Sequence, residues 1–190
     1  MAQNKELIIL TEGAIVTAAA QALAFVPHSV GISSIEVVYG LIPMAIFALR
    51  RGLKAGLMAG LVWGLLDMLL RGLSTGSVMN PLQGFIEYPI AFGAIGLIGL
   101  GSYKVKQTIS NGKNSLGWIL AFSALGFSVK YLFHFIAGGI FWAAFAPKGM
   151  NPWIYSLVIN GGSFIANMIM MLVLVIILHK VFNQLIMVKK

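Results

Sequence analysis

The chain alternates long apolar stretches with short polar breaks. Leu, Ile, Val, Met and Phe dominate the stretches, whereas Gly, Pro, Ser and Asn, which commonly end helices, gather in the breaks. A helix of about 20 apolar residues crosses the hydrocarbon core of a bilayer. The pattern therefore predicts about six transmembrane helices, near residues 6–26, 35–50, 53–71, 82–103, 115–144 and 152–182.

Composition supports an integral membrane protein. Hydrophobic residues make up 59% of the 190 and charged residues 9%, whereas soluble domains have about 45–50% apolar and about 25% charged residues. Glu6 and Glu12 interrupt the first apolar stretch and no small-residue cleavage site follows, so we expect a retained helix and not a signal peptide. Without cysteines there is no disulfide framework and no thiol chemistry. We predict an all-α, polytopic membrane protein in which residues 1–190 form one integral membrane domain.

The basic residues are unevenly distributed between the two sides of the predicted bundle. Six helices place both termini on one side, and ten Lys and Arg residues fall there: Lys5, Arg50, Arg51, Lys54, Lys104, Lys106, Lys113, Lys180, Lys189 and Lys190. Arg71 and Lys148 fall opposite, and Lys130 lies within a helix. The positive-inside rule then predicts cytoplasmic termini and explains the net charge of +8 without nucleic acid as a partner.

One carboxylate, Glu87, lies in the apolar and aromatic run "LQGFIEYPIAFG" (82–93). A carboxylate in a nonpolar medium must neutralise itself, find a partner or serve as a binding site. With the predicted orientation, Glu87 lies in the external half of the bundle, as do most polar side chains within the helices. We expect the protein to leave Glu87 unpaired, so that a ligand can pair with it.

The fifth helix places several functional groups on one face. Lys130, His134, Gly138 and Trp142 recur every four residues. A glycine beside an aromatic ring lets a flat ligand approach the main chain. The alternative is structural: an interfacial tryptophan, a hydrogen-bonded core histidine and a glycine that packs against another helix. Their coincidence with Glu87 at the same depth favours a binding site.

The third helix carries weaker signals. Its glycines recur every four residues, at Gly52, Gly56, Gly60 and Gly64, which indicates close packing against another helix. Trp63 is a candidate for ligand contact. Asp67 is expected to pair with Arg71, four residues further on.

The first helix carries a stripe of small residues, Ala14, Ala18 and Ala22, which indicates a close helix contact, either internal or with another subunit. The sequence contains no Walker motif, nucleophile elbow or His/Asp metal-ligand cluster. It therefore gives no indication of ATP hydrolysis, covalent catalysis, a metal site or a cofactor.

Three segments, "GFIEYPIAF" (84–92), "YLFHFIAGGIFWAAFAPKGMNPWIYSLVIN" (131–160) and "GLKAGLMAGLVWGLLD" (52–67), resemble the thiamine-specific substrate-binding subunits, or S components, of energy-coupling factor (ECF) transporters. The resemblance extends from about residue 35 to 165, and its first two motifs are specific. It implies a multi-pass protein of a bacterial plasma membrane that is not an enzyme and captures thiamine (vitamin B1) outside the cell. A membrane coupling subunit (EcfT) and two ATPase subunits would drive release inside.

The resemblance also implies roles for individual residues. In "EYP", Glu87 and Tyr88 match an acidic and aromatic pair whose carboxylate accepts hydrogen bonds from the aminopyrimidine of thiamine. Further matches to substrate-binding positions are His134, Gly138, the stacking Trp142, Tyr155, Asn160 and Glu36. Ala14 and Ala18 resemble the surface that docks on the coupling subunit. The chain departs from the family at "VGISSIE" (30–36), where a tryptophan is common, so a lid contact is either missing or supplied by Trp153 or Met79.

The candidate residues suit thiamine chemically, because a flat cation with a hydrogen-bonding pyrimidine needs carboxylates, aromatic faces and amides. Three alternatives stay open. The chain is an S component for another vitamin or a pyrimidine precursor, a self-sufficient membrane transporter, or a membrane enzyme with Glu87 and His134 as an acid–base pair. No activated nucleophile accompanies that pair, and we find no inverted repeat or broken helix of the kind that secondary transporters use.

Overall fold

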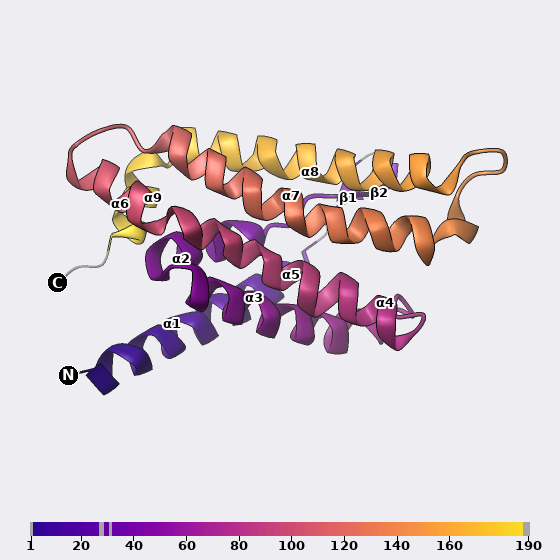
Figure 1. Ribbon diagram of the computed structural model, residues 1–190, viewed down its shortest axis with the longest axis horizontal. Helices are drawn as coiled ribbons and strands as arrows, with labels where there is room; N and C mark the ends of the chain where they lie inside the picture. Colours follow the sequence, from indigo (N-terminus) through magenta and orange to yellow (C-terminus); the bar gives the residue numbers. More distant parts are fainter. Residues whose placement is uncertain (1, 27–28, 31, 188–190) are drawn as a thin grey trace.

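A computed structural model describes residues 2–26, 29–30 and 32–187 as a bundle of long helices (Figure 1). The α-helices are α1 (Ala2–Leu23), α2 (Leu41–Arg51), α3 (Leu53–Asp67), α4 (Pro81–Phe85), α5 (Ala91–Gly93), α6 (Ser102–Ser110), α7 (Leu116–Ile140), α8 (Pro152–Ile177) and α9 (His179–Ile186). The π-helical segments are η1 (Met68–Gly72) and η2 (Ile86–Ile90), and the 3₁₀ segments are η3 (Ala94–Gly101) and η4 (Ala143–Phe145). Strands β1 (Ser29–Val30) and β2 (Ile32–Glu36) pair antiparallel.

The structure confirms an all-α, polytopic architecture apart from the short β1–β2 pair. In the described part of the chain, five helical segments are long and apolar enough to cross a membrane: Asn4–Leu23, Leu53–Gly72, Pro81–Ser110, Leu116–Ile140 and Pro152–Ile177. The segment Pro81–Ser110 runs longer than the expected helix 82–103 because α4, η2, α5, η3 and α6 follow one another without a break. Pro89, which has no N–H to donate, lies in the π-helical part of this segment.

The prediction of a second helix is wrong for the first part of its range. Residues 35–50 were expected to be helical, but β2 continues to Glu36 and α2 begins only at Leu41. The sequence "ISSIEVVYG" (32–40) is rich in β-branched and aromatic residues, which favour extended backbone. With 11 residues, α2 is about 16 Å long and is too short to cross a bilayer by itself.

The beginning of α1 and the helices α6 and α9 lie at the same end of the bundle (Figure 1). Basic residues meet at this end: Lys106 Nζ donates to the carbonyl of Arg50 over 2.5 Å, and Arg50 donates to the carbonyl of Leu185 over 2.8 Å. Lys189 and Lys190 lie outside the described residues. The start of α1 and the helix α9 thus lie on one side of the bundle, and the predicted cytoplasmic orientation of that side rests on the charge distribution.

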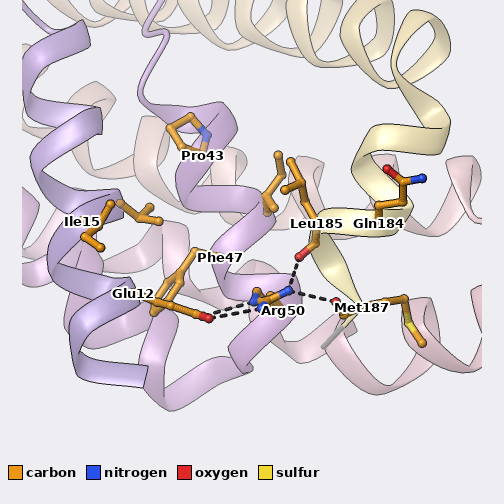
Figure 2. Close-up of a pocket in the computed structure, with 10 residues that line it drawn as sticks. Glu12, Ile15, Pro43, Phe47, Arg50, Gln184, Leu185 and Met187 are labelled. Atoms are coloured by element: carbon orange, nitrogen blue, oxygen red, sulfur yellow. Dashed lines mark hydrogen bonds and ion pairs between the residues drawn. The ribbon is translucent and has the colours of Figure 1, made fainter. Parts of the chain in front are cut away.

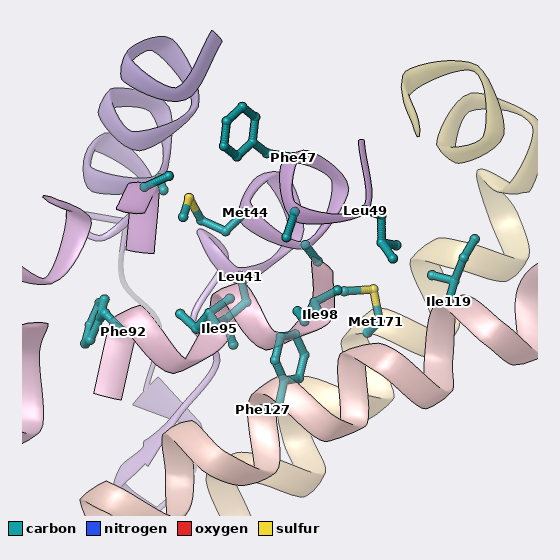
Figure 3. Packing of buried hydrophobic residues seen from close by; sticks show 14 of the residues in the cluster. Leu41, Met44, Phe47, Leu49, Phe92, Ile95, Ile98, Ile119, Phe127 and Met171 are labelled. Atoms are coloured by element: carbon teal, nitrogen blue, oxygen red, sulfur yellow. The ribbon is translucent and has the colours of Figure 1, made fainter. Parts of the chain in front are cut away.

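The apolar core surrounds the short helix α2 (Figure 3). Leu41, Met44 and Phe47 of α2 are buried, as are Phe127 of α7 and Met171 of α8. The cluster also includes residues from η3 and from α1, α3, α5, α6 and α9. The core therefore joins α2, η3, α7 and α8, which fixes the positions of the helices that surround the polar half of the molecule.

The glycines of α3 allow two backbones to touch. A Cβ atom added at Gly56 would lie 3.0 Å from Gly96 Cα, and one added at Gly60 or Gly64 would collide with the carbonyl oxygen of Phe92 or Tyr88. The predicted close helix packing is confirmed for these three glycines, whereas Gly52 lies in the turn before α3 with φ of 88° and nothing within 4 Å of an added Cβ. It presses α3 against the segment 88–96, which directly follows Glu87 in the chain.

We predict that Gly60→Ala destabilises the protein, because the new methyl group must displace the backbone of Phe92 and Gly93. The expected loss is about 1–3 kcal/mol, typical of overpacking. Thermal unfolding in detergent measures it. Gly117→Ala is the matched control: this helical glycine has nothing within 4 Å of an added Cβ, so the higher helix propensity of alanine should leave stability unchanged or slightly raised. Equal melting temperatures for both variants would contradict the packing role of Gly60.

Candidate functional site

A cavity of about 490 Å³ lies between the second half of α7, the first half of α8, β2 and η2. Its volume falls within the range of about 300–1,000 Å³ that is typical of small-molecule sites. The lining combines charged, amide, hydroxyl and aromatic side chains: Glu36, Ser77, Glu87, Lys130, Tyr131, His134, Gly138, Trp142, Phe145, Tyr155, Ser156, Ile159, Asn160 and Ser163. The structure thus brings together seven of the nine predicted substrate-binding residues.

Glu87 lies in the wall of this cavity and is only 9% exposed. Its Oε2 accepts hydrogen bonds from the indole N–H of Trp142, over 2.9 Å, and from the side-chain amide of Gln83. Its Oε1 lies 3.6 Å from Nδ1 of His134. The expectation that the protein leaves Glu87 unpaired is therefore wrong. A buried carboxylate needs donors even when no ligand is bound, and neighbouring side chains supply them.

The predicted polar face of α7 is present and lines the cavity. Lys130 Nζ and His134 Nε2 are 3.0 Å apart, and Gly138 follows one turn later. Trp142 lies just beyond the end of α7, and its side chain still reaches Glu87. His134 consequently stands between the Lys130 ammonium and the Glu87 carboxylate. Lys130 was predicted to lie on this face but was not among the predicted binding residues.

Glu36 reaches the cavity from β2 and not from the start of a helix. Its backbone N–H donates to Ser163 Oγ over 3.1 Å, and its carbonyl accepts from Asn167 Nδ2 over 2.8 Å. Asn167 Oδ1 also accepts from the N–H of Val38 over 2.8 Å. Helix α8 thereby binds the free edge of β2 through two polar side chains. Asn167 was missed, and its sequence signal is a single amide in the apolar run "FIANMIM" (164–170).

The beginning of α8 supplies Tyr155 and Asn160 to the cavity. Asn160 Nδ2 donates to the carbonyl of Ser156 over 3.0 Å, which fixes the amide. A Cβ at Gly138 would collide with Ser156 Oγ, so Gly138 both lines the cavity and allows α7 and α8 to approach. Gly139 packs against the ring of Trp153. Both glycines therefore serve helix packing, which was the structural alternative given for them from the sequence.

Trp63 and Tyr88 do not line the cavity, contrary to expectation. Trp63 is 0% exposed, with its ring edge-to-face against Phe92 at a centroid distance of 4.7 Å. The ring of Tyr88 stacks on that of Phe92 at a centroid distance of 6.3 Å, and it also lies against Gly72. Both rings are used in packing α3 and η1 against η2 and α5. The structure therefore gives no support to a ligand contact for either residue.

The suggested lid contacts also lie elsewhere. Trp153 packs on Gly139 and Phe135, and neither it nor Met79 belongs to the cavity lining. The side chains of "VGIS" (30–33), where the family commonly has a tryptophan, lie outside the described residues. Within the described part of the chain, no group of three or more His, Asp or Glu side chains is arranged to hold a metal ion.

Helix α1 does not contribute to the cavity. It contacts the bundle through Thr17, whose hydroxyl donates to the carbonyl of Ala59 over 3.4 Å, and through Gln21, whose amide donates to Asp67 over 3.2 Å. Asp67 also accepts from Arg71 over 3.2 Å, as predicted. Ala14, Ala18 and Ala22 are exposed. The internal alternative for this stripe is thus excluded, and docking on another subunit stays a prediction.

A second cavity, of about 470 Å³, lies at the other end of the bundle between α1, α2 and α9 (Figure 2). Arg50 donates to both carboxylate oxygens of Glu12 over 3.1 Å and to the carbonyls of Leu185 and Met187. Arg51 binds the same carboxylate. These charges satisfy one another and leave mainly apolar walls. The cavity around Glu87 is therefore the better candidate for a polar ligand.

Comparison with known proteins identifies the family of the chain. A family profile described as "Thiamine transporter protein (Thia_YuaJ)" matches residues 10–187. Thiamine transporter ThiT of Lacticaseibacillus paracasei is 47% identical over 187 residues, which cover 97% of this chain and 93% of that protein. Thiamine transporter ThiT of Bacillus subtilis is 33% identical, with 84% of each chain covered.

A solved structure of ThiT from Listeria monocytogenes has the same fold. It superimposes with a TM-score of 0.87 at 35% sequence identity, and the match covers 96% of this chain and 98% of that one. The relatives are named as transporters and not as enzymes. With several apolar membrane-crossing helices and a family match over nearly its whole length, this multi-pass cell-membrane protein belongs to the thiamine transporter protein family.

Proposed function

We propose that this protein is the high-affinity thiamine-binding subunit of an ECF-type importer and captures thiamine from the external side of the membrane. The observation that carries the proposal is the cavity around Glu87, which gathers Glu36, His134, Trp142 and Asn160 in a chain of the thiamine transporter family. Membership in the family does not by itself identify the partner subunits or the orientation in the membrane. Both are supported by separate observations.

The charges of the cavity suit a cationic ligand. Glu36 and Glu87 bring two negative charges and Lys130 one positive charge, so the lining is net negative while His134 is neutral. Charge-assisted hydrogen bonds contribute about 1.5–3 kcal/mol each, and a desolvated cation–π contact about 2 kcal/mol. In this proposal Glu87 Oε1 accepts from the aminopyrimidine, and the indole of Trp142 supplies a stacking surface whose edge is already fixed by Glu87.

External capture follows from orientation and cavity position together. The basic end of the bundle, with the start of α1 and α9, is expected in the cytoplasm. The second half of α7 and the first half of α8, which line the cavity, lie toward the opposite end (Figure 1). The chain carries no nucleotide-binding motif. In this proposal the energy for release comes from partners, and the exposed Ala14 and Ala18 on α1 offer a surface for a membrane coupling subunit and its two ATPases.

Isothermal titration calorimetry on the purified protein in detergent tests the ligand. We expect thiamine to bind with a Kd of about 1 nM to 1 μM, which corresponds to about −12 to −8 kcal/mol, and to bind more tightly than riboflavin. Thiamine phosphates are titrated in parallel. Tighter binding of riboflavin, or of an isolated pyrimidine, would assign the protein to a different ligand and overturn the thiamine proposal.

We predict that Glu87→Gln weakens thiamine binding at least about tenfold, or about 1.4 kcal/mol, because a neutral amide replaces a charged acceptor. The protein should remain folded, since the amide oxygen can still accept from Trp142 and Gln83. Calorimetry gives the affinity and thermal unfolding the stability. Glu6→Gln, the same change at an exposed position of α1, serves as the control and should bind like the parent. An unchanged affinity in Glu87→Gln would remove this residue from the site.

We predict that Ala14→Trp or Ala18→Trp binds thiamine normally but does not co-purify with the coupling subunit and its ATPases. A bulky side chain on this exposed stripe prevents the close helix approach that small-residue membrane contacts require. Ala19→Trp adds the same bulk about 100° around the helix and should retain the partners better. Parental uptake by both stripe variants would exclude this docking surface. Uptake by the isolated chain in liposomes would instead identify a self-sufficient transporter.

A further inference from the structure

Gln83 lies next to the cavity but does not line it. It is 0% exposed and belongs to α4, one turn before Glu87. Its side chain reaches in two directions, toward the Glu87 carboxylate and toward the loop of residues 73–80, which connects η1 with α4. A fully buried primary amide is costly unless all of its hydrogen-bonding capacity is used.

That capacity is used completely. The Nε2 amide donates to the carbonyl of Ser77 over 3.1 Å and to Glu87 Oε2, while Oε1 accepts from the N–H of Met79 over 3.0 Å. The amide nitrogen has two protons and both have acceptors, so the orientation of the amide is determined. Neither Glu nor an apolar residue can make the same set of contacts.

The arrangement gives the two oxygens of Glu87 different roles. Gln83 and Trp142 both donate to Oε2, whereas among the described residues the polar group near Oε1 is Nδ1 of His134, at 3.6 Å, which is too long for a hydrogen bond. A carboxylate held by two donors on one oxygen cannot rotate freely about its last torsion. Oε1 is therefore presented to the cavity in a fixed direction.

We propose that Gln83 is a positioning residue for substrate recognition: it orients Glu87 so that Oε1 meets the pyrimidine amino group, and it joins this carboxylate to the 73–80 loop. This inference rests on thiamine binding at Glu87, as proposed above. Gln83 acts through Glu87 and does not touch the substrate itself. Its contribution should consequently appear as selectivity for the amino group and should vanish when Glu87 is removed.

The experiment measures the affinities of thiamine and oxythiamine, in which an oxo group replaces the pyrimidine amino group, for the parent and for Gln83→Met and Gln83→Glu. Gln83→Met has similar length and no donors, and Gln83→Glu keeps the acceptor for Met79. We expect both variants to bind thiamine about tenfold or more weakly and to lose most of the preference for thiamine over oxythiamine. Gln107→Met, the same change at an exposed site on α6, should change neither value.

A double-mutant cycle separates positioning from general stability. In a Glu87→Ala background, Gln83→Met should alter thiamine affinity by less than about threefold, because nothing remains to be oriented. Gln83 would be only structural if its substitution weakened the binding of thiamine and of oxythiamine equally. The same would follow if the losses of thiamine affinity caused by Gln83→Met and Glu87→Ala multiplied in the double variant. Parental affinity in a folded Gln83 variant would also overturn the inference. If the parent itself does not bind thiamine, the proposed function fails instead.

Discussion

The arrangement of the polar half of the molecule depends on one constraint: a carboxylate in an apolar helix must be surrounded by donors. Glu87 meets this constraint through Gln83 of α4, Trp142 just beyond the end of α7, and the nearby His134 in the second half of α7. Satisfying one charge therefore fixes three side chains from two separate parts of the chain. The same contacts that make Glu87 tolerable without a ligand also give its free oxygen a direction.

Close packing of backbone segments holds the helix that carries Glu87 in place. The glycines of α3 let the 88–96 segment approach to contact distance, and the short α2 fills the core beside it. With its backbone held on one side by α3, η2 has little freedom to shift when a ligand enters. The π-helical turn at Ile86–Ile90 lies at this point of the fold, and such turns are frequent at functional sites.

The sequence predicted the features that depend on local spacing. Helical segments, the α3 glycine ladder and the shared face of Lys130, His134 and Gly138 all follow from periodicity along one helix. Features that depend on contacts between distant segments were not predictable in this way. Asn167 binds β2 across about 130 residues of sequence, and its partner strand was expected to be helical. Trp63 was chosen for its chemistry, but its place toward Phe92 is decided by the packing of α3.

The structure also separates recognition from the exposed surface of α1. Every lining residue of the Glu87 cavity comes from outside α1, whereas α1 is attached to α3 by Thr17 and Gln21 and leaves its alanine stripe exposed. Bulk added to that stripe therefore does not touch the cavity lining directly. In the proposed importer such a division is useful, because the proposed docking surface and the substrate site can then be optimised under different constraints. Helix α3 connects the two surfaces directly, because its glycine face lies against the Glu87 segment and its Asp67 accepts a hydrogen bond from Gln21 of α1.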